Sequence, residues 1–427
     1  MLKMFMIGRL KDIFFFPVAY YFAFWAKLQL RKWNPRVIVV TGSSGKTTLF
    51  NMVEAQLGSK AHYSHHANSA IGIPFDILDI HRKTLKPIEW ISIILKAPLQ
   101  AFKAPYKEEF YVAECDADRP REGKFLASIL KPEVTLWIST SRTHSMNFDK
   151  LVPHKFKSVE DAIAYEFGYF LEHTSKFAVV DGDSELMTNQ IPRTKAGIES
   201  VRIEKLSKYK ISKEGAEYTQ GKETIRLKTL QPKEVFYAIE MCKALTSYLE
   251  MPFDNTFKNL QISPARSSLF RGIKNITIID STYNANFSSM SAILSMFQEF
   301  KAKIKWTVIG DMLEQGSVEQ EEHEKLAELL LKIDTKRIVL LGPRVKKYTY
   351  PILKEKLEKN IPVDVFENPR EVLELLQKEI KGGETILFKG ARFLEGVIEN
   401  LLLDKKEKIL LARREKIWDE RRHKWGL

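Results

Sequence analysis

The chain has 427 residues, and 67 lysines and arginines against 54 aspartates and glutamates give it a formal net charge of +13. This length suggests two or three domains, and its 44% hydrophobic and 28% charged residues are ordinary globular usage, which argues against wholesale disorder. Only two cysteines occur, Cys115 and Cys242, which excludes a disulfide scaffold and a cysteine-ligated zinc or iron–sulfur site and fits a reducing cytoplasm.

The positive charge is concentrated at the two ends of the chain. Residues 1–36 carry seven basic side chains against Asp12, a net +6, and residues 404–427 carry nine against five acidic ones, a net +4. Nucleic-acid-binding proteins usually carry a basic stripe across the folded body, so we expect no nucleic-acid partner. The C-terminal run is best interpreted as a solvated helix face.

The first predicted element is an uncharged, aromatic-rich stretch over residues 13–26. Its 14 residues fall short of the ~20 that a membrane-spanning helix needs, and no small-residue cleavage site of a signal peptide follows. Aromatic rings flanked by basic residues suit the headgroup boundary of a bilayer, so contact with the inner face of a membrane is one interpretation. An N-terminal helix packed on the first domain is the other.

After residue 36, short β-rich runs alternate with helix-length segments, which predicts parallel sheets covered by helices. The first half has expected strands at 37–40, 110–114, 134–139 and 177–181, hairpin-like strands within 201–230, and helices near 46–57, 121–130, 158–172 and 232–250. The second half has expected strands at 276–279, 306–310, 337–341, 362–366 and 385–388, separated by helices near 288–300, 318–333, 344–357, 370–380 and 391–403.

These elements predict an α/β fold in three parts. The aromatic and basic N-terminal segment covers residues 1–35, and a central P-loop ATPase domain with a parallel sheet covers 36–262. A Rossmann-like, doubly wound domain with a basic tail covers 263–427.

The central domain contains a phosphate-binding loop. The strand at 37–40 leads into TGSSGKTT, residues 41–48, and then into a helix, which is the setting that such a loop requires. Glycines let the backbone turn tightly, so that amide N–H groups and the N-terminus of the helix face phosphate oxygens. The lysine can reach the β- and γ-phosphates, and the hydroxyl after it can ligate Mg²⁺. The residues expected to hold ATP and Mg²⁺ are Gly42, Ser43, Ser44, Gly45, Lys46, Thr47 and Thr48.

The same loop resembles the TGTNGKTT-type loop of the Mur ligases, ATP-dependent enzymes that form the amide bonds of the peptidoglycan peptide. Two later stretches are similar to the D-alanyl-D-alanine-adding branch of that family: PARSSLFRGIKNITIIDSTYNANFSSM, from residue 264, and WTVIGDMLEQGSVEQEEH, from residue 306. FKGARFLEG, from residue 388, resembles a third segment, so the resemblance covers about residues 36–400.

The resemblance implies a metal site at the end of a strand. Glu114 and the downstream His144 would ligate a second Mg²⁺ on the γ-phosphate, beside the Mg²⁺ held by Thr47; a hard cation prefers carboxylate oxygen. Two positions depart from the family, with Ser139 in place of an asparagine and Phe167 in place of a carbamylated lysine. The neighbouring residue, Glu166, would either supply a carboxylate or lie on a solvated helix face.

The resemblance also implies contacts with nucleotide and substrates. Arg266 would reach the nucleotide phosphates, and Asp280, Tyr283 and Asn284 would hold the ribose and adenine side, although Asp280 can equally cap the turn that follows it.

The expected substrate contacts come from three residues. Lys389 and Arg392 would face the carboxylate of the amine substrate, or lie in an exposed helical turn. Asn68, in HHANSAIGIP, would lie beside the acyl substrate.

The sequence therefore predicts an ATP-dependent carboxylate–amine ligase that acts through an acyl phosphate in peptidoglycan precursor or related cell-wall peptide synthesis. It would add an amino acid or dipeptide, with Lys46, Glu114, His144 and Arg266 as catalytic residues. Because the phosphate loop starts at Thr41, we expect the UDP-sugar domain of the family to be missing. The expected location is the cytoplasm, peripheral at the inner face of the membrane.

Two alternatives stay open. One is a Mur-like ligase that acts on poly-γ-glutamate, folate or a tetrapyrrole. The other is a membrane-associated nucleotide-binding scaffold without turnover.

Overall fold

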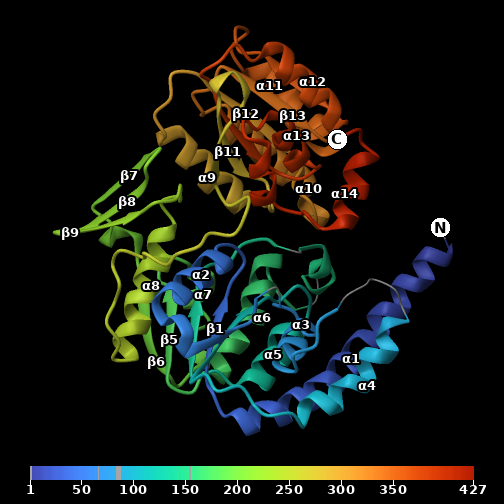
Figure 1. The fold of residues 1–427 in the computed structure, drawn as a ribbon, viewed down its shortest axis with the longest axis vertical. Helices are drawn as coiled ribbons and strands as arrows, with labels where there is room; N and C mark the ends of the chain where they lie inside the picture. Colours follow the sequence, from blue (N-terminus) through green and yellow to red (C-terminus); the bar gives the residue numbers. More distant parts are fainter. Residues whose placement is uncertain (1, 66, 83–87, 144, 153–154) are drawn as a thin grey trace. The chain divides into compact units, whose positions relative to one another are not determined.

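The computed structural model describes residues 2–65, 67–82, 88–143, 145–152 and 155–427 (Figure 1). By its packing the chain forms two compact units. Unit 1 consists of the residues up to Thr140 together with Lys150–Arg202 and Tyr237–Phe253, and unit 2 consists of Ser141–Asp149, Ile203–Phe236 and Asp254–Leu427.

Unit 1 is built on a six-stranded sheet in the order β2-β3-β1-β4-β5-β6, in which every neighbouring pair is parallel. Its strands are β1 (Arg36–Thr41), β2 (Ala61–Tyr63), β3 (Phe110–Cys115), β4 (Val134–Trp137), β5 (Phe177–Asp181) and β6 (Gly197–Val201). β1 and β3 are buried runs of mainly β-branched and aromatic residues, as expected for central strands of a parallel sheet. Their register pairs Val40 with Glu114, so the two strands end at the same edge.

The helices of unit 1 are α1 (Leu2–Trp33), α2 (Lys46–Leu57), α3 (Gly72–Ile77), α4 (Glu89–Ala101), α5 (Glu122–Leu130), α6 (Val159–His173), α7 (Glu185–Thr188) and most of α8 (Val235–Tyr248). The hydroxyl of Ser158 caps α6 by accepting a hydrogen bond from the N–H of Asp161, a standard helix start. The predicted helices of this half are therefore present, whereas β2, β6, α3, α4 and α7 were not predicted.

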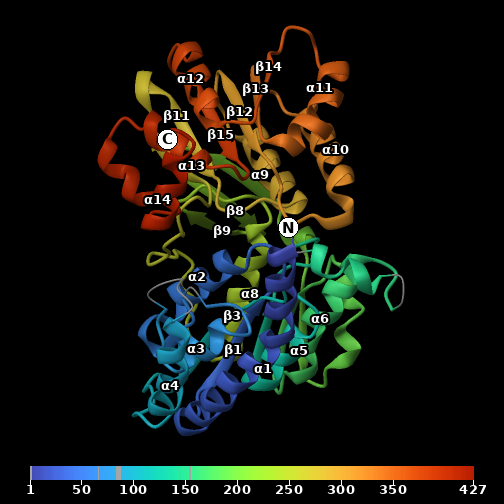
Figure 2. The same ribbon diagram turned by 90° about the vertical axis from the view of Figure 1, so that its right-hand side faces the viewer.

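The N-terminal helix α1 packs on unit 1, against α3 and α4 (Figure 2). The ring of Phe22 is fully buried and lies 4.7 Å from the ring of Phe75. The indole N–H of Trp33 donates a hydrogen bond to the carbonyl of Glu108 at 2.7 Å. The expected packed helix is thus present, and no helix in the described part of the chain is long and apolar enough to cross a bilayer.

Unit 2 has a second six-stranded sheet, in the order β10-β11-β15-β12-β13-β14. Its strands are β10 (Ser268–Arg271), β11 (Thr277–Ser281), β12 (Lys305–Gly310), β13 (Arg337–Leu341), β14 (Val363–Phe366) and β15 (Thr385–Lys389). Its helices are α9 (Phe287–Glu299), α10 (Glu319–Leu330), α11 (Tyr350–Lys356), α12 (Pro369–Glu379), α13 (Leu394–Leu401) and α14 (Lys416–His423). Only β10, which was not predicted, runs antiparallel to its neighbour.

The core of unit 2 is formed by the inward faces of these strands and of α12 and α13, with Ile278, Val308, Val339 and Phe388 fully buried. A separate three-stranded antiparallel sheet accounts for the predicted hairpins, with β7 (Lys208–Ser212), β8 (Gly215–Gln220) and β9 (Glu223–Leu227). The expected α/β class, with a parallel sheet followed by a doubly wound domain, is confirmed.

Candidate active site

The phosphate loop joins β1 to α2 in a conformation that needs glycine. Gly42 has φ +135° and Gly45 has φ +82°. A Cβ atom on Gly42 would lie 2.7 Å from the carbonyl oxygen of Ser139, so no side chain fits there. The first helical bond of α2 runs from the N–H of Leu49 to the carbonyl of Gly45, at 3.0 Å. The N–H groups before Leu49 in the first turn of α2 therefore take no part in the hydrogen bonds of the helix itself. Such N–H groups at the start of a helix can bind an anion.

The ammonium of Lys46 lies inside the loop. Its Nζ atom is 2.9 Å from the Oδ2 atom of Asp116 and donates a hydrogen bond to the carbonyl of Gly42 at 2.6 Å. Burial on its own would lower the pKa of Lys46, but the negative charges of Asp116 and Glu114 outweigh it and raise the pKa above its usual value. The lysine is therefore held as a cation. Asp116 was not predicted, although it follows the same strand as Glu114.

Glu114 and Thr47 meet at the end of the sheet. The hydroxyl of Thr47 donates a hydrogen bond to the Oε1 atom of Glu114 at 3.0 Å, across 67 positions of the chain. The N–H of Glu114 donates to the hydroxyl of Ser64 at 2.9 Å, which fixes the end of β3. The predicted meeting of the phosphate loop with Glu114 is therefore present in the structure.

The donor set fits Mg²⁺. A hydroxyl and a carboxylate are hard oxygen ligands, and Mg²⁺ usually takes only one or two protein ligands beside phosphates and waters. Within the described ranges, no group of three histidine, cysteine, aspartate or glutamate side chains could hold a metal ion by itself. His144, the other predicted ligand, lies outside the described residues.

The residues beside His144 belong to unit 2 and contact another of its segments. The carboxylate of Asp149 accepts hydrogen bonds from the N–H and the hydroxyl of Ser317, each at 3.0 Å. The hydroxyl of Ser145 donates to the carbonyl of Glu314 at 3.2 Å. These contacts tie the segment to the turn between β12 and α10.

Ser139 braces the phosphate loop. Its hydroxyl donates to the carbonyl of Ser44 at 2.8 Å and accepts from the N–H of the same residue at 2.9 Å, and its carbonyl accepts the N–H of Ser43 at 3.0 Å. The serine that departs from the family pattern thus positions the loop. The sequence carried no signal for this role.

Phe167 and Glu166 lie inside unit 1. Phe167 is fully buried, and its ring centroid lies 6.0 Å from that of Trp137. The Oε1 atom of Glu166 accepts the N–H of Arg121 at 2.9 Å, just before α5. Burial raises the pKa of Glu166. The predicted solvated helix face is therefore wrong for Glu166, because the inward side of α6 packs against α5.

The segment that contains Asn68 is tied to the end of β3. The N–H of Asp116 donates to the carbonyl of Asn68 at 2.8 Å, and the N–H of Ala70 donates to the Oε1 atom of Glu122 at 2.8 Å. Glu122 is almost completely buried, and burial raises its pKa to about 7. The structure thus brings Asn68 next to the partner of Lys46, and Glu122 is a further residue that sequence reasoning missed.

Four of the predicted residues of unit 2 lie close together. The guanidinium of Arg266 lies 4.6 Å from the ring centroid of Tyr283, which is about half exposed. The Nζ atom of Lys389 donates a hydrogen bond to the carbonyl of Asn284 at 2.6 Å. Burial and the nearby charge of Arg266 lower the pKa of Lys389 to about 7, against the opposing effect of Asp280.

Burial decides between the alternatives for Lys389, and hydrogen bonds show one role of Asp280. Lys389 is the last residue of β15 and only 4% exposed, so the expectation of an exposed helical turn is wrong for it. Asp280 is buried and accepts hydrogen bonds from the N–H and the hydroxyl of Thr282, at 3.0 and 2.7 Å, so it holds the turn after β11. Burial raises its pKa to about 6.

Arg392 has a different partner from Lys389. Its Nε and Nη2 atoms both lie 3.0 Å from the Oδ2 atom of the fully buried Asp311, and its φ is +83°. The same carboxylate accepts the N–H groups of Arg344 and Val345, at 3.1 and 3.0 Å. Asp311 thus joins Arg392 to the residues that follow β13, a role that was not predicted from the sequence.

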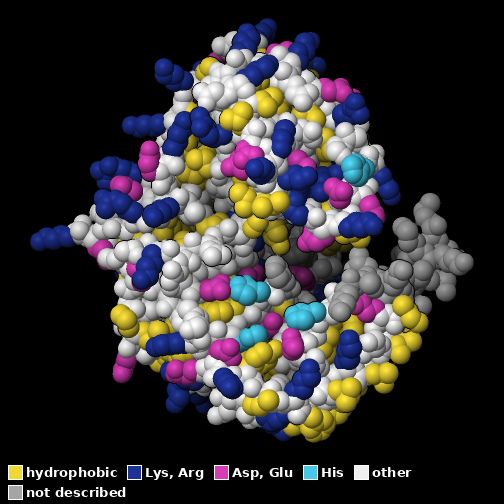
Figure 3. All heavy atoms as spheres, viewed as in Figure 1, with side chains coloured by type: hydrophobic (Ala, Val, Ile, Leu, Met, Phe, Trp, Pro, Cys, Tyr) yellow, Lys and Arg dark blue, Asp and Glu magenta, His cyan; other side chains and the backbone are white. Residues whose placement is uncertain are grey.

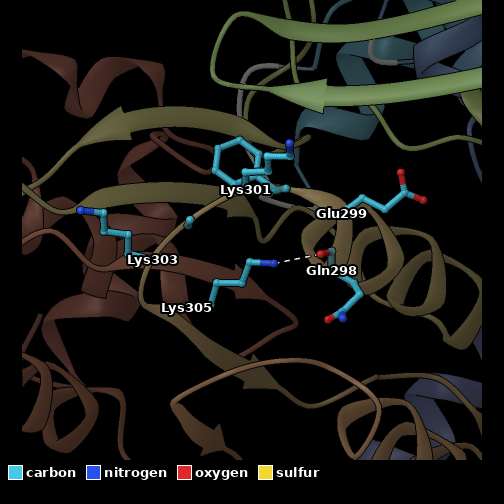
Figure 4. A pocket seen from close by; sticks show the side chains of 7 residues that line it. Gln298, Glu299, Lys301, Lys303 and Lys305 are labelled. Carbon is cyan, nitrogen blue, oxygen red and sulfur yellow. Dashed lines mark hydrogen bonds between the residues drawn. The ribbon is translucent and has the colours of Figure 1, made fainter.

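A hollow of about 400 Å³ lies elsewhere in unit 2 (Figure 4). It is lined by Gln298–Lys303 and Lys305, at the amino end of β12. The predicted nucleotide and substrate residues of this unit lie at the carboxyl ends of β11 and β15, which is where open α/β sheets bind ligands. This hollow therefore does not belong to the candidate site.

Comparison with known proteins finds one family. The model of the Mur ligase middle domain matches residues 40–242, and the model of the Mur ligase glutamate ligase domain matches residues 265–392. The UDP-N-acetylmuramoyl-tripeptide–D-alanyl-D-alanine ligase of Bacillus subtilis is 24% identical over 398 residues, which cover 88% of this chain and 78% of that protein. The enzyme of the same name from Escherichia coli is 23% identical over 331 residues, 75% of this chain and 67% of that protein.

Solved structures show the same fold. The MurF ligase of Thermotoga maritima, in complex with ADP, is similar with a TM-score of 0.71 and 20% identity, covering 92% of this chain and 84% of that one. The folylpolyglutamate synthase of Mycobacterium tuberculosis, complexed with ADP and AMPPCP, has a TM-score of 0.58 and 13% identity, covering 92% of this chain and 96% of that one.

Proposed function

Because this chain belongs to the Mur ligase family, we propose that it joins the carboxylate of a peptidoglycan precursor to the amine of an amino acid or dipeptide, with cleavage of ATP to ADP and phosphate. ATP and Mg²⁺ are its cofactors. The observation that carries the proposal is the meeting of Lys46, Thr47, Glu114 and Asp116 at the carboxyl edge of the unit 1 sheet. This arrangement suits a triphosphate and its metal ion.

The reaction has two displacements. An oxygen of the substrate carboxylate attacks the γ-phosphorus of ATP, the bond from that phosphorus to the β–γ bridging oxygen breaks, and ADP leaves. The amine nitrogen then attacks the carbon of the acyl phosphate, the bond from that carbon to the phosphate oxygen breaks, and the nitrogen loses a proton as the amide forms. Little covalent chemistry is required of the protein, so positioning and charge neutralisation determine the rate.

The residues of unit 1 have distinct parts in this scheme. Lys46, kept cationic by Asp116, neutralises charge on the transferred phosphoryl group. Thr47 and Glu114 would hold Mg²⁺, and the bound ion would supply further charge neutralisation at that group. Ser139 keeps the loop in place through its three hydrogen bonds.

We also propose that residues of unit 2 contact the nucleotide. Arg266 would bind nucleotide phosphates, with Asp280, Tyr283 and Asn284 on the ribose and adenine side. The support is that Arg266 lies over Tyr283 and that Lys389 binds Asn284.

The proposed substrate contacts are Lys389 and Arg392 for the carboxylate of the amine and Asn68 for the acyl donor. Lys389 is buried beside another cation, so a bound anion would stabilise its protonated form. Asn68 is supported by its backbone contact with Asp116. We propose His144 as a further metal ligand because of the resemblance of the sequence to the Mur ligases.

Phosphate release tests the proposal. Purified protein with Mg-ATP, UDP-N-acetylmuramoyl-tripeptide and D-alanyl-D-alanine is expected to release phosphate only when both substrates are present. Lys46→Ala is expected to reduce this rate about a hundredfold or more. Lys60→Ala, which removes an exposed lysine just after α2, is the matched control and should leave the rate unchanged.

Two outcomes of this assay would redirect the proposal. Turnover with glutamate and a folate, and none with the peptidoglycan substrates, would move the chain to the acceptor class of the folylpolyglutamate synthase. ATP binding without turnover in the presence of any of these substrates would favour the alternative of a nucleotide-binding scaffold. The proposed location is the cytoplasm, at the inner face of the membrane, with residues 13–26 close to the lipid.

A further inference from the structure

The helix α4 of unit 1 exposes an apolar face. Its inward residues Ile93, Ala97 and Ala101 are buried, as in any packed helix. Most of the side chains that point outward are nevertheless also apolar, and they recur at helical spacing along and beside α4, with exposures from 39% to 71%: Ile88, Ile91, Ile94, Leu95, Leu99 and Phe102. In Figure 3, hydrophobic side chains gather along the lower right margin, over α4. A soluble helix normally presents polar residues there, so this face is unusual.

The neighbouring helix α1 continues the apolar surface. Phe14, Tyr20 and Phe24 are between 57% and 64% exposed and lie on one side of α1. The ring of Trp25 joins the two helices, since its centroid lies 4.9 Å from that of Phe24 and 6.2 Å from that of Phe102. Figure 2 looks onto this side of unit 1, with α1 between α4 and α5. We call this surface, formed by the exposed apolar residues of α1 and α4, the apolar face.

A cationic hollow of about 280 Å³ lies along the last turns of α1 and the end of α5. Lys27, Arg31 and Lys131 line it, and its lining includes no aspartate or glutamate. Burial lowers the pKa of Lys27, and the nearby charges of Lys131 and Arg31 lower it further. The end of α5 favours the charge of Lys131, but it does not account for the other two cations. An anionic group in this hollow would relieve their repulsion.

We propose that the apolar face and the cationic hollow together dock unit 1 on the surface of an anionic phospholipid bilayer. The exposed rings and aliphatic side chains would enter the headgroup region, and a lipid phosphate would bind Lys27, Arg31 and Lys131. Lys96 and Lys103, both exposed on and beside α4, add positive charge around the same face.

Charge and composition favour a lipid surface as the occupant. Residues 1–36, which include α1, carry a net +6 and so complement anionic headgroups. Aromatic residues near cations are typical of the membrane interface. The surface is formed by the outer sides of helices, so it suits a plane of lipid. Binding to it requires no turnover, so this inference stands or falls separately from the proposed ligase activity.

Vesicle flotation with the full chain tests the inference. Vesicles of phosphatidylglycerol and phosphatidylcholine are expected to carry the protein, and vesicles of phosphatidylcholine alone, or high salt, should weaken the binding. The triple variant Ile91→Ser, Leu95→Ser, Leu99→Ser should lower the partition coefficient at least about tenfold, because three exposed apolar groups are lost. Its matched control is Leu403→Ser, Ile409→Ser, Leu410→Ser in unit 2, whose targets are between 52% and 73% exposed.

A second pair of variants tests the cationic hollow. Neutralising Lys27, Arg31 and Lys131 together to glutamine should reduce binding to the phosphatidylglycerol vesicles and flatten its salt dependence. The control neutralises the exposed Lys332, Lys336 and Lys359 of unit 2 in the same way. Circular dichroism and thermal melting of each variant show whether it folds like the parent protein.

Three results would overturn the inference. The first is failure of the parent protein to float with any vesicle. The second is equal flotation of the parent protein and of the triple serine variant of α4, when that variant is folded. The third is a dimer, detected by analytical ultracentrifugation, that the serine substitutions dissociate while vesicle binding is absent, because the face would then serve a second copy of this chain.

Discussion

Lys46 keeps its positive charge in a buried position because carboxylates lie beside it. Asp116 is in direct contact with its ammonium, at 2.9 Å, and Glu114 adds a second negative charge. The sequence predicted the lysine and Glu114 because a phosphate loop and the carboxyl end of a neighbouring strand meet at one edge of a parallel sheet. It could not predict Asp116, Ser139 or Glu122, whose roles depend on how side chains pack after the strands end.

Replacement of Asp116 should change the pH range of ATP binding. In Asp116→Asn the burial of Lys46 is opposed mainly by Glu114, so the pKa of the lysine falls and its charge is lost at a lower pH. We expect ATP affinity, measured by calorimetry across pH 6–10, to decline at a lower pH than in the parent protein. Asp118→Asn removes a weaker neighbour and should shift the profile less. Identical profiles for all three proteins would contradict the assigned role of Asp116.

Glu122 should make unit 1 less stable as the pH rises. Its pKa is about 7 in the folded protein against an ordinary 4.5, so between these values the folded state binds more protons than the unfolded chain. Unfolding free energy therefore falls as the pH rises from 4.5 to 7, by an amount on the order of 3 kcal/mol. Glu122→Gln keeps an acceptor for Ala70 but removes the titration.

The measurement for Glu122 is a comparison of thermal melts at pH 5 and pH 8. The parent protein should lose more stability between the two pH values than the glutamine variant. An equal loss in both proteins would show that the buried carboxyl does not titrate as described.

At the scale of elements, hydrophobic pattern and loop chemistry identified most of the strands and helices. The exceptions have physical reasons. β2 has three residues and α3 has six, which are too few for a repeating pattern of hydrophobic residues to be recognised. α4 contains a proline, Pro98, which in a sequence argues against a helix interior, and many of its exposed residues are apolar. Lys389 lies at the end of a strand rather than in a helical turn, and its burial follows from its place between β11 and β12.

The phosphate loop requires glycine at residue 42. Gly42→Ala combines a positive φ with a Cβ atom 2.7 Å from the carbonyl oxygen of Ser139, so we expect a loss of stability and of ATP affinity. Gly58→Ala is the control, because Gly58 also has a positive φ, +53°, but nothing lies within 4 Å of its Cβ position. It should cost only ~1 kcal/mol of strain and leave ATP affinity unchanged. Equal ATP affinity of the two variants would contradict this account of the loop.

At the scale of the whole molecule, each of the two units has its own six-stranded sheet. The resemblance to the Mur ligases, inferred from the phosphate loop and from three stretches of the second half, is confirmed by the two domain matches. The sequence could identify the family because those stretches are long and occur in order. It could not identify the apolar face, which depends on the side of α4 that packs against α1.

The central claim is that this protein makes an amide through an acyl phosphate at the Lys46 and Glu114 site. Labelling both oxygens of the reacting carboxylate of UDP-N-acetylmuramoyl-tripeptide with ¹⁸O follows the bond changes directly. After reaction with Mg-ATP and D-alanyl-D-alanine, we expect each released phosphate to carry one ¹⁸O atom and the amide to keep the other. Amine-dependent phosphate without the label, or no amine-dependent phosphate at all, would contradict the account.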